Sequence, residues 1–177
     1  MARQGAVVGR PYYPDDLRPK TTWDDAVNRL RRANTFWIAT VRHDCRPHVM
    51  PVLGVWVDGA LHFCAGPNTA KARNLKRDPH CVITAAADAL DLVIEGTALR
   101  VKDHSTVARA ADAYKTKYAW DAEPRGDAFY GEGAPTAGPP PLDLYRFVPA
   151  LAFGFGTDES LSAMRWEFRR DSTASPK

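Results

Sequence analysis

Apolar and polar residues alternate over much of the chain with the two-residue period of β-strands. Runs rich in aromatic and β-branched residues strengthen this prediction, and Asp58-Gly59 between two of the runs is a strong hairpin signal. The first three runs are expected to form an antiparallel meander, because the connections between them are short. The predicted strands cover residues 36–42, 48–57, 60–65, 81–87, 91–101, 142–156 and 162–168.

Three further stretches repeat their apolar residues at helical spacing. Residues 21–35 predict a helix that Thr22 caps, with acidic residues in its first turn. A second helix is predicted over residues 103–120, and a short basic one over residues 69–77. The combination favours a mostly β fold, an antiparallel barrel or sheet into which helices are inserted.

Composition limits the classes of protein that the chain can represent. With 177 residues and 45% apolar content, it has the size of a single domain. Its 24 basic and 21 acidic residues are interspersed, which argues against a nucleic-acid-binding protein because no concentrated basic stripe is present. We expect one domain over residues 22–170, an N-terminal arm over residues 1–21 and a flexible tail over residues 171–177.

Cysteine usage and the N-terminal sequence predict a cytoplasmic protein. The three cysteines, Cys45, Cys64 and Cys81, are widely spaced, which favours free thiols in a reducing compartment. The first residues lack the apolar core of a signal peptide, and no apolar run approaches the roughly 18 residues of a membrane span. We therefore expect no membrane partner. The histidines at positions 43 and 48 fit no common zinc spacing, so no metal site is expected.

The short basic helix carries the first candidate for chemistry. At about 100° per residue, Lys71 points within about 40° of Leu75 and so shares the helix face that is turned toward the sheet. A buried lysine is costly unless an anion awaits it, and Thr69 with the free N–H groups of the first turn would complete a phosphate site. The alternative is that Lys71 extends its amine to solvent or pairs with a carboxylate.

Several motifs occur in an order that resembles a known family. They are the strand-rich PHVMPVLGVWVDGALHFCAG, the helical NTAKARNLKRDPHCVIT, the strand DLVIEGTALRV and a late MRWEF. In this order they resemble the pyridoxamine 5'-phosphate oxidase-like, flavin-binding split-barrel superfamily over about residues 22–170. The resemblance implies a Greek-key-like split β-barrel with six to seven antiparallel strands. It also implies a homodimer with two cofactor sites in clefts at the dimer interface.

The resemblance also implies which residues bind the cofactor. Those residues are Met50, Pro51 and Val52 along the flavin ring, Cys64, Ala65, Thr69 and Lys71 at the phosphate, and Arg165 and Trp166, which would close the site. Asn74 is a further candidate, although it can equally cap or pack the short helix.

Departures from the family pattern bear on the cofactor. Where the oxidases have an arginine and, five residues on, a lysine for the flavin phosphate, this chain has Val49 and Gly54, and Ala70 replaces a third basic residue. Each lost charge-assisted contact is worth about 1.5–3 kcal/mol, so vitamin B6 oxidation is disfavoured. The chain is more similar to the actinobacterial branch that uses the deazaflavin coenzyme F-420, whose internal phosphodiester suits one inward lysine and surrounding arginines such as Arg73.

The implied activity is hydride transfer from reduced F-420 to a small or planar unsaturated organic acceptor, in which the cofactor supplies the chemistry. No catalytic residue is predicted, and the substrate proton would come from solvent or from a tyrosine such as Tyr130 or Tyr145. The loop GEGAPTAGPPP at residues 131–141 is either a lid or a plain connector. Two alternatives stay open: an FMN-dependent oxidoreductase of the same fold, and a non-catalytic protein that binds a flavin, a deazaflavin or haem.

Overall fold

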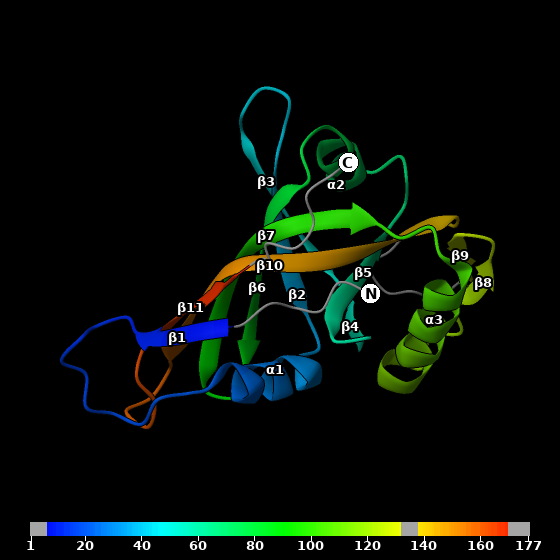
Figure 1. Ribbon diagram of the computed structural model, residues 1–177. Helices are drawn as coiled ribbons and strands as arrows, with labels where there is room; N and C mark the ends of the chain where they lie inside the picture. Colours follow the sequence, from blue (N-terminus) through cyan, green and yellow to red (C-terminus); the bar gives the residue numbers. More distant parts are fainter. Residues whose placement is uncertain (1–6, 132–137, 170–177) are drawn as a thin grey trace, which may run out of the picture. The chain divides into compact units, whose positions relative to one another are not determined.

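The computed structural model describes residues 7–131 and 138–169 as a mostly β protein with three helices (Figure 1). The eleven described strands belong to one sheet, and the strand pairs with assigned register are antiparallel. The predicted mostly β, antiparallel architecture with inserted helices is therefore confirmed. Residues 1–6 of the predicted arm, residues 132–137 of the GEGAPTAGPPP loop and the predicted tail at 171–177 lie outside the described residues.

The elements follow one another in an order that keeps hairpin partners close in sequence. They are β1 (Val7–Pro11), α1 (Trp23–Arg32), β2 (Phe36–Val41), β3 (Pro47–Val52), β4 (Gly54–Val57), β5 (Ala60–Ala65), α2 (Ala70–Arg77), β6 (His80–Ala87), β7 (Leu90–Arg100), α3 (His104–Tyr118), β8 (Glu123–Arg125), β9 (Ala128–Tyr130), β10 (Leu142–Gly156) and β11 (Met164–Phe168).

The chain divides into two compact units. The first comprises the described parts of Met1–Ala33, Thr84–Glu95 and Pro149–Lys177, and the second comprises those of Asn34–Ile83 and Gly96–Val148. The long strands β6, β7 and β10 contribute residues to both units. The single domain expected over residues 22–170 stays a prediction.

The first unit packs α1 and strands β1, β10 and β11 around tryptophan side chains. Thr22 caps α1 as predicted, because its Oγ1 accepts the Asp25 backbone N–H at 3.1 Å. Strand β11 pairs with β1 on one side and β10 on the other, which places Trp166 opposite Gly9 and next to Gly154. A Cβ at either glycine would lie 2.8 Å from the Trp166 ring, so the indole fills the space that the two glycines leave.

The second unit contains two hairpins and carries the residues of interest. Strands β2 and β3 form the first hairpin, and β4 and β5 form the second. The Asp58-Gly59 turn has positive φ at both residues, 50° and 75°, as a type I′ hairpin turn requires. Leu53 interrupts the predicted strand at residues 48–57, which the structure resolves into β3 and β4.

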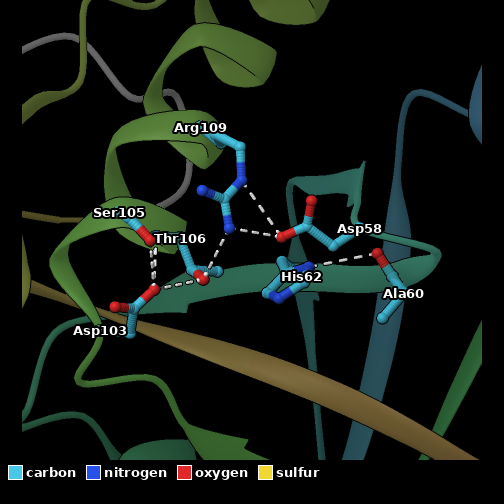
Figure 2. Close-up of polar contacts among 7 residues, drawn as sticks. All are labelled: Asp58, Ala60, His62, Asp103, Ser105, Thr106 and Arg109. Atoms are coloured by element: carbon cyan, nitrogen blue, oxygen red, sulfur yellow. Dashed lines mark hydrogen bonds and ion pairs between the residues drawn. The ribbon is translucent and has the colours of Figure 1, made fainter. Parts of the chain in front are cut away.

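Helix α3 covers the apolar face of this unit beside the β8–β9 hairpin (Figure 1). Tyr114 is fully buried there, donates its hydroxyl to the Leu53 carbonyl at 3.1 Å, and meets the rings of Trp120 and Phe129 edge-on. At the start of the helix, Arg109 reaches the Asp58 carboxylate at the β4–β5 turn (Figure 2). The helix is thus fixed by an apolar stripe and by an ion pair at its N-terminal end.

Three strands of the structure are absent from the sequence prediction. Strand β1 is short and mostly exposed, while β8 and β9 have three residues each, so none of them shows a readable alternation. Among the described residues, none of the helices is both long enough and apolar enough to span a membrane.

Candidate anion and cofactor site

Helix α2 is held against β2 by the face that the sequence predicts. Thr69 caps it: its Oγ1 accepts the Ala72 N–H at 3.3 Å and donates to the Gly66 carbonyl at 2.8 Å. The buried residues of the helix are Lys71, Ala72, Asn74 and Leu75. The prediction that Lys71 shares the inward face with Leu75 is confirmed.

Lys71 is a buried cation without a counter-charge. The residue is only 5% exposed. No hydrogen bond or ion pair joins its side chain to any residue in the described part of the chain. Burial is the largest influence on the pKa of Lys71 and lowers it, while the nearby Cys64 acts in the opposite direction. Burial raises the pKa of Cys64 to about 11, so this thiol is neutral near pH 7 and supplies no negative charge. No carboxylate within the described residues pairs with Lys71, so this half of the alternative is not realised. The Lys71 Nζ is not among the fully buried, unpartnered side-chain atoms of the described residues, so the amine keeps some contact with solvent.

A hydrogen-bonded set of polar side chains lies beside Lys71. Asn74 donates its Nδ2 to the hydroxyl of Thr40 on β2 at 3.0 Å. That hydroxyl lies 3.4 Å from the His48 carbonyl and 3.5 Å from the His48 Nδ1 on β3. Burial lowers the pKa of His48, and the positive charges of Arg42 and Lys71 lower it further. We call Thr40, His48, Lys71 and Asn74 the Lys71 cluster.

Two members of this cluster escape the sequence analysis. Thr40 and His48 come together because they are direct partners in the β2–β3 register. The register depends on the turn between the strands, where Cys45 adopts a positive φ of 64° and lets Arg42 pair with Arg46. A cysteine at that turn position is not a recognisable hairpin signal, so no pattern in the sequence indicates the juxtaposition.

The predicted ring-binding residues lie on β3 but do not share one face. Met50 is on the side of His48 and is 40% exposed, whereas Pro51 points to the opposite side of the strand. Val52 faces the same way as Met50 but is buried in the core. A flat ligand on the Lys71 side of β3 would therefore contact Met50 and only the backbone of the other two residues.

The predicted phosphate residues on β5 are buried. Cys64 is opposite Leu144 and Ala65 is opposite Asp143 in the pairing of β5 with β10. Both Cys64 and Ala65 are sealed from solvent, so their side chains are not accessible to a ligand. Of the four predicted phosphate residues, Thr69 and Lys71 are those with functional groups at the start of α2.

The remaining candidates belong to the other compact unit or are engaged in other contacts. Arg73 is exposed and donates to the Asn68 carbonyl in the loop that precedes α2. Arg165 and Trp166 belong to the other compact unit, where Arg165 pairs with Glu167 and Trp166 is a core residue beside Trp23. The structure does not assemble these two residues with Lys71 within one unit.

A second half-buried amine occurs at Gly54, where the family resemblance leads one to expect a lysine. Lys117 of α3 donates to the Gly54 carbonyl at 2.9 Å and lies over the rings of Phe36 and Tyr118. Burial lowers the pKa of Lys117 to about 8. A Cβ on Gly54 would lie 2.7 Å from the Phe36 ring, so this backbone does not accommodate a side chain at that position without rearrangement.

The two candidate proton donors differ in accessibility. Tyr145 is buried, stacks on Phe63 at 5.3 Å, and has its pKa raised to about 12 by burial. Tyr130 on β9 is half-buried, with the Arg125 guanidinium over its ring. No group of three or more potential metal-ligating side chains gathers within residues 7–131 and 138–169.

Comparisons with known proteins agree with the fold. The sequence profile of the pyridoxamine 5'-phosphate oxidase family matches residues 22–149. A search of the curated proteins finds no match. Among solved structures, a conserved hypothetical protein of Mycobacterium tuberculosis has a TM-score of 0.64 at 15% identity, covering 81% of this chain and 90% of its own.

Two further structures carry functional names. An F420 reductase has a TM-score of 0.50 at 20% identity, covering 71% of this chain and 93% of its own. A haem-binding protein of Mycobacterium smegmatis has a TM-score of 0.60 at 18% identity, and the match covers 88% of this chain and 60% of that protein. At these identities the likeness extends to the fold alone.

Proposed function

The chain belongs to the pyridoxamine 5'-phosphate oxidase family, and we propose that within it the protein is a coenzyme F-420-dependent oxidoreductase. Members of this family have the split-barrel fold and bind FMN or related flavins. When bound, reduced F-420 supplies a hydride, which a small or planar unsaturated organic acceptor would receive. The observation that carries the proposal is the buried, unpaired ammonium of Lys71.

Lys71 suits an anionic ligand because no described residue supplies a negative charge to its ammonium. A buried ammonium without a partner is unfavourable, and a bound phosphodiester would convert this cost into a charge-assisted contact. The Thr69 hydroxyl is engaged with Gly66 and Ala72, so the donors at this helix end are the first-turn N–H groups of α2 that the cap does not use.

The same residues favour F-420 over FMN. A terminal phosphate monoester carries nearly two charges and is usually met by several cations. Here Gly54 has no side chain and Ala70 opens the helix without charge, while the exposed Val49 lies on the face of β3 turned away from the Lys71 cluster. One buried lysine suits the single negative charge of an internal diester better.

The remaining task of the chain is to hold the ring system and limit access of water. Met50 provides an exposed apolar contact on the Lys71 side of β3, and Pro51 leaves the strand without an N–H at that position. Tyr145 is too deeply buried, and its pKa too high, to deliver a proton to a ligand. Solvent or Tyr130 therefore stays the source of the substrate proton.

A homodimer accompanies this proposal. The face of the β2–β3 hairpin turned away from the Lys71 cluster exposes Trp37, Val41 and Val49 at 48%, 44% and 51%. These side chains form an apolar strip of the kind that monomers rarely leave in water, and a second copy of this chain is the proposed occupant. Light scattering at micromolar concentration should give twice the chain mass for the wild type, and a monomer for the wild type would refute the dimer.

Parallel fluorescence titrations with F-420 and FMN test the function. We expect F-420 to bind at least about ten times more tightly than FMN, and Lys71→Ala to weaken F-420 binding by about 10- to 150-fold. Lys76→Ala is the matched control, since Lys76 is an exposed lysine of the same helix and should change the affinity by less than about twofold.

Three outcomes would contradict the assignment in different ways. Preference for FMN would favour the FMN-dependent oxidoreductase. Tight F-420 binding without hydride transfer to any enone or quinone, or a haem absorption band, would favour the non-catalytic binding protein. Equal affinities of the wild type and Lys71→Ala would remove Lys71 from the site.

A further inference from the structure

Among the described residues, His48 is the titratable side chain that contacts the hydrogen-bonded pair Thr40 and Asn74. It sits on β3 opposite Thr40, whose hydroxyl is in turn held by Asn74 from α2. Asn74 follows Lys71 by three residues, so both lie on one face of the helix. Three elements, β2, β3 and α2, thereby bring an imidazole and an ammonium to one place.

The imidazole of His48 has one polar contact within the described residues, on its Nδ1 edge. The Thr40 hydroxyl lies next to Nδ1, while no described residue hydrogen-bonds to Nε2. His48 is half-buried rather than sealed, so a ligand bound beside Lys71 can reach this nitrogen. The ring therefore leaves its Nε2 free of described protein partners and available to a ligand.

The charges that act on His48 are all positive. Lys71 faces it from α2, and Arg42 from the end of β2, while Thr40 and Asn74 are neutral. The nearest acid in the hairpin turn, Asp44, is paired with Arg46 and lies among exposed residues. Protonation of His48 in the free protein would add a positive charge beside those of Lys71 and Arg42, with no negative charge nearby to offset it.

We propose that His48 is the second residue of the anion site and that it takes up one proton when the cofactor anion binds beside Lys71. This inference rests on the proposed function. The anion offsets the repulsion from Lys71 and Arg42, so the imidazolium becomes stable and donates its Nε2–H to the ligand. The proton comes from solvent, and no covalent bond changes.

Linkage between proton uptake and ligand binding makes the affinity depend on pH. Because binding favours the protonated imidazole, protonation must favour binding by the same factor. The affinity for the anion should therefore rise as the pH falls, until His48 is protonated in the free protein as well. A phosphodiester keeps its charge over this range, so the dependence belongs to the protein.

Isothermal titration calorimetry at pH 7, in two buffers of different ionisation enthalpy, tests the proton uptake. F-420 binding to the wild type should take up more protons than binding to His48→Gln, by a sizeable fraction of one proton. Comparing the variants cancels protons taken up by the ligand itself. His48→Gln should also bind about tenfold more weakly at pH 6 but within about threefold of the wild type at pH 9. His80→Gln is the control, because His80 is exposed and already paired with Asp78, and it should behave like the wild type.

A second measurement separates this inference from the proposed function. Sulfate is a permanent anion, and NMR titration should show that it raises the pKa of His48 in the wild type but not in Lys71→Ala. If F-420 binds through Lys71 while wild type and His48→Gln take up equal numbers of protons, the inference is overturned and the function stands. If F-420 does not bind, the function fails, and the sulfate response alone decides whether His48 and Lys71 form an anion site.

Discussion

Two polar clusters in the second unit differ in how their charges are balanced. The first is the Lys71 cluster on α2, β2 and β3. The second, which we call the Arg109 cluster, lies at the start of α3 and comprises Asp58, His62, Asp103, Thr106 and Arg109 (Figure 2).

In the Arg109 cluster, each charged group has a partner. Arg109 donates to the Asp58 carboxylate at 2.6 Å, and Asp103 accepts the Thr106 backbone N–H at 2.8 Å as the cap of α3. In the Lys71 cluster, no carboxylate of the described residues approaches the lysine. Paired charges at a helix end are sufficiently explained by folding, whereas a largely buried cation without a counter-charge favours an anionic ligand.

The largest expected effect concerns His62 in the Arg109 cluster. His62 is 1% exposed, its Nδ1 lies 3.1 Å from the Ala60 carbonyl, and its Nε2 has no partner among the described residues. Burial lowers its pKa from 6.5 to about 4, so between these pH values the unfolded chain binds more protons than the folded one. Stability is therefore retained above pH 6.5 and falls by about 3 kcal/mol as the pH drops toward 4.

Urea unfolding at several pH values measures this loss. His62→Gln should flatten the decline between pH 6.5 and 4, since glutamine does not titrate. An unchanged slope in the variant would mean that the imidazole of His62 already protonates freely in the folded protein.

The second largest effect is expected at Lys71, whose buried charge should lower stability while it supports F-420 binding. Lys71→Met keeps the aliphatic stem and removes the buried charge, so the ligand-free protein should gain about 1–2 kcal/mol of stability while losing F-420 binding. Chemical denaturation without and with F-420 provides both values. A less stable Lys71→Met protein would show that the ammonium contributes to folding after all.

The smallest effect is expected at Arg109. Arg109→Met breaks the ion pair with Asp58, but both side chains are partly exposed, and pairs of this kind contribute little. The melting temperature should fall by no more than about 2 °C, and F-420 affinity should not change. A loss of F-420 affinity in this variant would remove the distinction between the two clusters.

Features whose signal is local in the sequence are predicted correctly. The Thr22 cap, the Asp58-Gly59 turn and the inward direction of Lys71 depend on a few neighbouring residues, and all three are confirmed. The mostly β class follows from the same kind of signal, since alternation is visible within each strand.

Contacts that depend on strand register are not predictable from the sequence. The pairing of Thr40 with His48 requires the register of β2 against β3, which a cysteine in a positive-φ turn sets. The contact of Lys117 with Gly54 joins residues far apart in the sequence. Burial of Cys64 and Ala65 likewise depends on β10, so their inaccessibility was not visible from the β5 sequence.

The most direct test of the central claim is the NMR titration of the Lys71 amine with and without F-420. The account predicts a pKa below the usual 10.5 in the free protein, because the ammonium is buried without a partner, and a rise in that pKa when F-420 binds. A pKa at or above 10.5 in the free protein, unchanged by F-420, would contradict the account.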